Sequence, residues 1–231
     1  MSDEKLPSAT FCGNYAFMAK MILHFLNAGN QFSGLEGWLG EVLTVGFDRV
    51  ATLLPLRDTD VVVKVSENVI AEVGHHGYAP EAGLIHITID PNHKYFRENA
   101  DSALKRTLAH ELHHSARWDG PGYGDILGEA LVTEGLAGHF AQEAFGGQPE
   151  PWENLPVTDL HPNLTRAQQE WDSATYNHEA WFFGYSDLPR WLGYSLGYQM
   201  VSRYLAKHHR ESASGLVHQD SQAFRSFLMQ I

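Results

Sequence analysis

The stretch "LAHELHHSAR", residues 108–117, contains side chains that together can bind a metal ion and activate water. It includes the pattern H-E-x-x-H, with His110 and His114 at its ends and Glu111 after the first histidine. On a helix, residues four apart lie on one side, so the two imidazoles can share one ion. Glu111 lies about 100° further round, within reach of a water on that ion. The pattern predicts a metal site with its own general base, although a chain with fourteen histidines makes the motif alone only suggestive.

The third ligand is expected on the next predicted helix, residues 125–145. A catalytic zinc usually takes three protein ligands and leaves the fourth position to water. Helical periodicity places Glu134 in a stripe of apolar and small residues, whereas Glu129 falls on the other side. A buried carboxylate is costly without a cation, so Glu134 pairs either with the metal shared by His110 and His114 or with an arginine. The small residues beside Glu134 are expected to let this helix approach the H-E-x-x-H helix closely.

H-E-x-x-H followed by T-E-G-L-A at 133–137 resembles the glutamate-zincin metallopeptidases. The resemblance implies that His110, His114 and Glu134 bind Zn²⁺ and that Glu111 is the general base. Well-studied members also have a tyrosine that stabilises the transition state, in a Y-x-x-G context. In "GYSLGY" Tyr194 has this spacing, with Tyr198 as a competitor.

The segments "EGLAGHF" and "GYSLGYQMV", with H-E-x-x-H, are also similar to an uncharacterised family of predicted zinc-dependent proteases, over about residues 84–205. Two departures from the wider clan matter. Its aminopeptidases have G-x-M-E-N before the active-site helix, but "GLIHITIDP" has no acid before Asp90, so an aminopeptidase is not supported. Gly138 stands where some members have an aspartate behind the first histidine, and no replacement is identifiable from the sequence.

The order of the helices and strands expected around these residues predicts an α+β, zincin-like fold. A small N-terminal sheet would precede the active-site helix and a mainly helical C-terminal lobe. We expect one domain, residues 1–231, with lobes of about 1–118 and 119–231. Two helices are expected within about 14–54, strands at 61–65, 69–73 and 84–89, and further helices at 101–117, 125–145, about 165–176, 193–208 and 221–229.

Several side chains and one strand have alternative interpretations. Arg106, His113 and Arg117 form a helical stripe that is expected to face water. The strand at 84–89 is expected to lie nearest the metal helix, either as an ordinary sheet strand or as an edge that pairs with an extended peptide. His178 is either a second oxyanion donor or a structural histidine.

Composition excludes several classes of partner. The formal net charge of -12, without long basic runs, opposes binding to nucleic acid and to anionic membranes. The single cysteine, Cys12, excludes an internal disulfide and a thiolate metal site. The acidic, polar start "MSDEKLPSAT" does not resemble a secretory signal, so we expect a cytoplasmic protein.

The resulting prediction is a zinc-dependent peptide-bond hydrolase that acts on a peptide or protein substrate, with Glu111 as general base. Two alternatives keep the same metal site: a zinc-containing hydrolase of a non-peptide bond, and a non-catalytic interaction protein stabilised by metal. A helical binding module with an accidental motif is a further alternative, but it would leave Glu134 buried without an evident partner.

Overall fold

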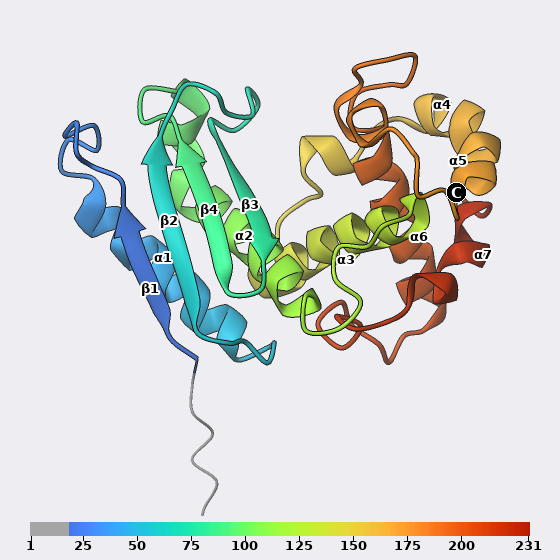
Figure 1. Cartoon of the computed structure of the whole chain (residues 1–231), viewed down its shortest axis with the longest axis horizontal. Coiled ribbons are helices and arrows are strands. Elements are labelled where there is room, and N and C mark those ends of the chain that lie inside the picture. The colour runs from blue at the N-terminus through green and yellow to red at the C-terminus, as the bar shows by residue number, and fades with distance from the viewer. Residues whose placement is uncertain (1–18) are drawn as a thin grey trace, which may run out of the picture.

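The computed structural model describes residues 19–231, except for the side chains of residues 97–99. Figure 1 shows a sheet with two helices against it at one end of the molecule and a mainly helical part at the other. The helix that carries H-E-x-x-H and the helix that carries Glu134 lie where the two parts meet. The α+β class and the order of a small sheet before a helical part are confirmed.

The sheet has four strands in the order β1-β2-β4-β3. Strands β1 (Met21–Phe25), β2 (Thr59–Val65) and β4 (Leu84–Ile89) are parallel, and β3 (His75–Glu81) pairs antiparallel with β4. Parallel neighbours need a crossover, and helix α1 (Glu36–Ala51) provides it between β1 and β2. Strands β1 and β3 are therefore the two edges of the sheet within the described part of the chain.

Helix α2 (Lys94–Arg117) fixes the position of H-E-x-x-H because its apolar stripe is buried against the sheet. Figure 1 shows α1 and α2 on the same face of the sheet. Leu104, Leu108 and Leu112 of α2 are fully buried in one core with alternating residues of β2 and β4, namely Val61, Val63, Ile85, Ile87 and Ile89. The stripe of leucines leaves His110 and His114 on the side of α2 that faces the helical part.

The helical part is built around α3 (Leu127–Phe145), which packs against both α2 and α6 (Leu192–Lys207). A second hydrophobic core joins these helices to the shorter elements, and its largest buried members are Trp171, Trp181, Phe182 and Phe224. The shorter elements are η1 (Pro151–Glu153), α4 (Val157–Leu160), η2 (His161–Asn163), α5 (Leu164–Glu170), η3 (Glu179–Phe183), η4 (Ser221–Ala223) and α7 (Arg225–Leu228).

A glycine beside Glu134 lets the backbone of α3 touch that of α6, while α3 also packs against α2 and brings Glu134 to the two histidines. A Cβ on Gly135 would lie 2.3 Å from the carbonyl oxygen of Gly197, and a Cβ on Gly197 would lie 2.1 Å from that of Leu131. Both positions therefore require glycine for the two backbones to touch. This contact fixes the position of α6 along α3, and therefore the position of Tyr194 relative to Glu134.

Four predicted elements differ from the structure, and one of these is the helix expected at about 165–176, which ends at Glu170. Residues 21–25, expected in a helix, form strand β1, in which every second residue is half-buried; the part of that expected helix before residue 19 lies outside the described residues. Residues 69–73 form no strand, since Ile70 makes only an isolated bridge with His75 and a turn follows it, and the third strand is His75–Glu81 instead. The predicted helix at 221–229 is divided into η4 and α7.

The expectation that Arg106, His113 and Arg117 face water is wrong, because all three are buried. The segment 213–219 covers this side of α2. His113 lies 3.4 Å from the carbonyl oxygen of Ala213, and Arg117 donates to the carbonyl oxygens of Val217 and Gln219 and to Thr133. The polar side chains of this stripe therefore bond to backbone carbonyls and to other side chains instead of to solvent, and His113 Nδ1 and Arg117 Nη2 are buried without a partner among the described residues.

Candidate metal centre and cleft

The side chains of His110, His114 and Glu134 converge on one point between α2 and α3. Glu134 Oε2 lies 3.0 Å from His110 Nε2 and 3.4 Å from His114 Nε2. In a tetrahedral zinc site with bonds of about 2.0–2.1 Å, ligand atoms are about 3.3 Å apart. The donor set of two imidazoles and one carboxylate therefore fits Zn²⁺ in both chemistry and spacing. Among residues 19–231 this is the only cluster of three metal-ligating side chains.

The charges at this point favour an ionised carboxylate. Burial alone would raise the pKa of Glu134, but the imidazoles of His114 and His110 hold it well below the ordinary carboxyl value. Burial likewise opposes a charge on His110, and the Glu134 carboxylate overcomes it and raises the pKa of His110 to about 9. No arginine contacts Glu134 in the described part of the chain, so the alternative of an arginine partner is not supported.

Tyr123, which the sequence did not single out, orients the third ligand. Its hydroxyl donates a hydrogen bond of 2.7 Å to Glu134 Oε1, which leaves Oε2 directed at the two imidazoles. Burial and the neighbouring Glu134 charge raise the pKa of Tyr123 well above its usual value, so the hydroxyl keeps its proton. Groups that hydrogen-bond to a metal ligand in this way fix its geometry. Tyr123 lies in the turn between α2 and α3, where no periodic pattern marks it.

Glu111 is buried against the edge strand β3. Its carboxylate lies beside the backbone of Ala79. Burial raises the pKa of Glu111 above that of an ordinary carboxyl group, with His110 and His114 acting against it. A carboxylate with a raised pKa is a stronger base, and it lies beside the converging ligand atoms in the same cavity.

Gly77 of β3 leaves the space that Glu111 fills. A Cβ at this position would lie 2.4 Å from Glu111 Cγ and 2.6 Å from Glu111 Oε1. The atoms that would have to move belong to the Glu111 side chain and not to the backbone. A larger residue at position 77 would therefore displace the carboxylate at little cost to the fold.

Gly77→Ala is expected to lower kcat about 100-fold, since a shift of about 1 Å in a reacting group has an effect of this size. The melting temperature and zinc content should change little, because the added methyl group displaces Glu111 alone. Gly37→Ala on α1, where a Cβ meets no atom within 4 Å, is the matched control. Unchanged turnover in Gly77→Ala would show that Glu111 does not act from the position seen here.

Tyr194 of α6 lies at the site, whereas its competitor Tyr198 does not. Tyr194 lines the cavity with Glu111 and Glu134, and burial together with these two charges raises its pKa well above the usual tyrosine value. Tyr198 instead donates to Gln142 and stacks on His139 at 3.9 Å. Between the two tyrosines, only Tyr194 can reach a group bound in the cavity.

His178 also lines the larger cavity, but its ring is already engaged. It stacks on Phe182 with ring centroids 4.5 Å apart, and its Nδ1 lies 3.2 Å from the Tyr176 hydroxyl. Burial lowers the pKa of His178, so it is neutral at pH 7. These contacts support the structural interpretation of His178 and leave Tyr194 as the better placed donor.

Glu153 of η1 occupies the space beside Gly138. A Cβ on Gly138 would lie 2.2 Å from Glu153 Oε1, and Glu153 lines a cavity together with His110. Its charge is one of those that raise the pKa of His110. A carboxylate from a separate element thus lies near the first histidine, where the sequence alone showed only the missing aspartate. Gly138 is the signal in the sequence that another side chain occupies this space, but a glycine does not identify which residue that is.

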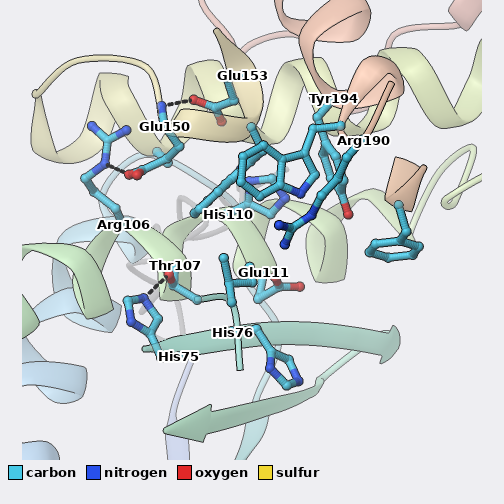
Figure 2. Close-up of a pocket in the computed structure, with 16 residues that line it drawn as sticks. His75, His76, Arg106, Thr107, His110, Glu111, Glu150, Glu153, Arg190 and Tyr194 are labelled. Atoms are coloured by element: carbon cyan, nitrogen blue, oxygen red, sulfur yellow. Dashed lines mark hydrogen bonds and ion pairs between the residues drawn. The ribbon is translucent and has the colours of Figure 1, made fainter. Parts of the chain in front are cut away.

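Two adjoining cavities open onto the site. The larger, of about 840 Å³, is lined by all of His110, Glu111, His114, Tyr123, Glu134 and Tyr194. Figure 2 shows the smaller one, which Tyr194 and Arg190 border from the helical part and His76 from β3. The two cavities share eight lining residues, including His110 and Glu111, and so form one cleft between the sheet and the helical part.

The strand beside the cleft is β3 and not the strand at 84–89. That strand, β4, lies between β2 and β3 and is paired on both sides, so it cannot add a peptide at its edge. The expectation that it lies nearest the metal helix was therefore wrong. Residues 76–80 of β3 line the larger cavity instead. The segment "HHGYAPE" was not predicted as a strand because its glycine and proline are uncommon in strands.

Residues 41–225 match the protein family described as "Predicted Zn-dependent protease (DUF2268)". The matched region includes both metal helices, the edge strand and α6. This chain belongs to that family, a class of proteins predicted to be zinc-dependent proteases.

A search of curated proteins finds similarity to the uncharacterised protein YjfC of Bacillus subtilis (strain 168), which is 27% identical over 152 residues. The alignment covers 59% of this chain and 49% of YjfC, so the chain spans about half the length of this relative. No solved structure matches. The zincin-like fold and the glutamate-zincin subclass therefore remain predictions.

Proposed function

We propose that this protein is a zinc-dependent peptide-bond hydrolase of the glutamate-zincin type. The observation that carries the proposal is the convergence of His110 Nε2, His114 Nε2 and Glu134 Oε2 beside the buried carboxylate of Glu111. These three residues would hold the zinc ion. When bound, zinc lowers the pKa of its water to about 7 and polarises a carbonyl group.

In this mechanism Glu111 accepts a proton from the attacking water and passes it to the leaving amine. Glu111 lines the cleft beside Ala79 of β3, in the same cavity as the three ligand residues. Tyr194 keeps its proton at neutral pH and donates a hydrogen bond to the developing oxyanion. Tyr123 holds Glu134 in place through its hydrogen bond to Oε1.

The shape of the cleft supports a peptide or protein as substrate. Strand β3 offers an edge to which an extended peptide could add by backbone hydrogen bonds. Exposed aromatic side chains border the cleft on both sides, with Tyr78 62% and Tyr185 77% exposed, and these could bind apolar side chains. This combination favours a peptide over a small non-peptide substrate.

The direct test removes zinc with a chelator and assays a quenched-peptide library before and after zinc is restored. Cleavage should disappear with the metal and return in proportion to bound zinc. A protein that binds one zinc ion per chain but cleaves no peptide would refute the proposal. It would then favour a hydrolase of another bond or a metal-stabilised interaction protein.

Tyr194→Phe is expected to lower kcat about 100-fold, which is the usual effect of losing one oxyanion donor. Zinc content should be unchanged, because the Tyr194 hydroxyl is not among the converging ligand atoms. The control is Tyr198→Phe on the same helix, which loses only the hydrogen bond to Gln142 and should retain full turnover. A normal rate in Tyr194→Phe would remove this role from Tyr194.

No nucleic acid or membrane enters this proposal, in line with the net charge of -12. Within residues 19–231, no helix combines the length and the apolarity that crossing a bilayer requires. We also propose a cytoplasmic setting, which rests on the single cysteine.

A further inference from the structure

Arg190 brings a positive charge into the larger cavity, which is also lined by two buried carboxylates. It lines both cavities, and among the described residues that line the larger one it is the only arginine or lysine. Glu111 and Glu134 line the same cavity. In Figure 2 the Arg190 side chain extends beside Tyr194 into the smaller cavity. A substrate that binds in the larger cavity therefore meets one arginine side chain near the reacting groups.

The backbone next to Arg190 is held in an uncommon conformation. Trp191 has φ of 70°, in the left-handed region that bulky residues rarely adopt, and it is the residue before α6. The Arg190 guanidinium lies 4.1 Å from the centre of the Trp191 ring. Such strained residues cluster at binding and catalytic sites, because the surrounding structure must hold them there. The strain and the ring contact together fix the guanidinium at the cleft.

The hydrogen-bonding capacity of Arg190 is largely unused. Its side chain is 51% exposed, and among residues 19–231 its one side-chain hydrogen bond is a long contact of 3.4 Å from Nη1 to Glu72 Oε1. The other carboxylate oxygen of Glu72 is buried without a hydrogen-bond partner in the described part of the chain. A guanidinium has five N–H donors and favours bidentate contact with a carboxylate. The pair with Glu72 is therefore weak and can be exchanged.

Arg106, the other arginine of the smaller cavity, does not offer this capacity. It is buried, forms an ion pair of 2.6 Å with Glu150, and donates to the carbonyl oxygens of Gly146 and Gln148. These contacts tie the segment after α3 to α2, so Arg106 has a structural role. Arg190 is the arginine that remains free to bind a ligand.

We propose, on the basis of the proposed function, that the guanidinium of Arg190 binds a carboxylate group of the peptide substrate. In the free protein the carboxylate of Glu72 occupies the place of this substrate group. The substrate carboxylate is either an acidic side chain at a fixed distance from the scissile bond or the terminal carboxylate of the peptide. Both present the same two oxygens to the guanidinium. Glu72 lies in the loop between β2 and β3, so the exchange would take place at the border of the cleft.

The test uses pairs of peptides that differ only in one group: glutamate against glutamine at successive positions, and a free against an amidated C-terminus. Wild type should show a KM about tenfold lower for the member with the carboxylate, the size expected for a partly exposed charge-assisted hydrogen bond. A preference limited to one internal position identifies a side chain, and a preference limited to the free terminus identifies the terminal carboxylate.

Arg190→Gln should abolish this difference in KM, and Arg190→Lys should retain part of it, because lysine keeps the charge but loses the bidentate geometry. Glu72→Gln should lower the KM of the carboxylate-containing peptides, since it removes the competing group. The matched control is Arg225→Gln. Arg225 likewise pairs with an acid, Asp172, and lies near a tryptophan ring, Trp171, but it does not line the cleft.

The same peptide pairs are titrated into the Glu111→Gln protein, which should bind peptides without cleaving them. Binding or cleavage that does not depend on the carboxylate would overturn the role of Arg190 and leave the peptidase proposal intact. Zinc-loaded wild type that cleaves no peptide would refute the peptidase, while the binding titrations would still decide whether Arg190 selects a carboxylate.

Discussion

Glu111→Gln is expected to lower peptide turnover about 10²- to 10⁴-fold, the range typical of a general acid or base, and to leave zinc bound. Glutamine fills nearly the same space beside Gly77 and can still contact the backbone of Ala79, so the fold should be unaffected. It cannot accept the proton of the attacking water. Steady-state kinetics on a cleaved library peptide, together with zinc analysis of the purified protein, measure the two effects separately.

Glu41→Gln, an exposed carboxylate on α1, is the control for the same chemical change away from the cleft. It should match wild type in both measurements. If Glu111→Gln turned over peptide at the wild-type rate, the base would have to be sought elsewhere, and Gly77→Ala should then also be active. Loss of zinc from Glu111→Gln would instead indicate that Glu111 supports the metal site.

Glu134→Gln is expected to weaken zinc binding by more than about 100-fold, because even loss of a residue that supports a ligand has effects of 10- to 100-fold. The amide brings no negative charge to offset the ion, and its nitrogen cannot act as a ligand while protonated. Peptide turnover at limiting zinc should disappear with the metal. Competition with a chromophoric chelator measures the change in affinity.

Glu129→Gln is the matched control, since Glu129 lies on the same helix and was the competing candidate in the sequence. Its carboxylate accepts hydrogen bonds from the backbone N–H groups of Asp125 and Ile126 at the start of α3. This variant should lose about 1 kcal/mol of stability, as for a weakened helix cap, and keep its zinc. Zinc binding that is equal in wild type and Glu134→Gln would contradict the ligand assignment.

The part of the site that lies on two periodic helices could be predicted from the sequence. The spacing of four between His110 and His114 and the position of Glu134 in an apolar stripe both follow from 3.6 residues per turn. Tyr123 and Glu153 could not be found in this way. They come from a turn and from η1, and only the long-range packing of α2, α3 and η1 brings them to the ligands.

The sheet was predicted less well because its edge strand β3 has an untypical sequence. The β-branched strands at 61–65 and 84–89 are present, but β3 contains Gly77 and Pro80 and has little strand propensity. Its place next to α2 explains both features: glycine admits Glu111, and a proline is tolerated at an edge. Gly77 and Pro80, which made β3 hard to predict, are thus the residues that suit an edge strand beside Glu111.

The burial of Arg117 and His113 under residues 213–219 has a consequence for biosynthesis. The helix that carries His110, Glu111 and His114 has one side that remains open to water until this late segment has left the ribosome and packed against it. Before then Arg117 lacks the carbonyl oxygens of Val217 and Gln219, and α2 lacks part of its support. A nascent chain that stops before residues 213–219 is therefore expected to lack a rigid metal site, and the proposed hydrolytic activity is expected to arise only after this segment has packed against α2.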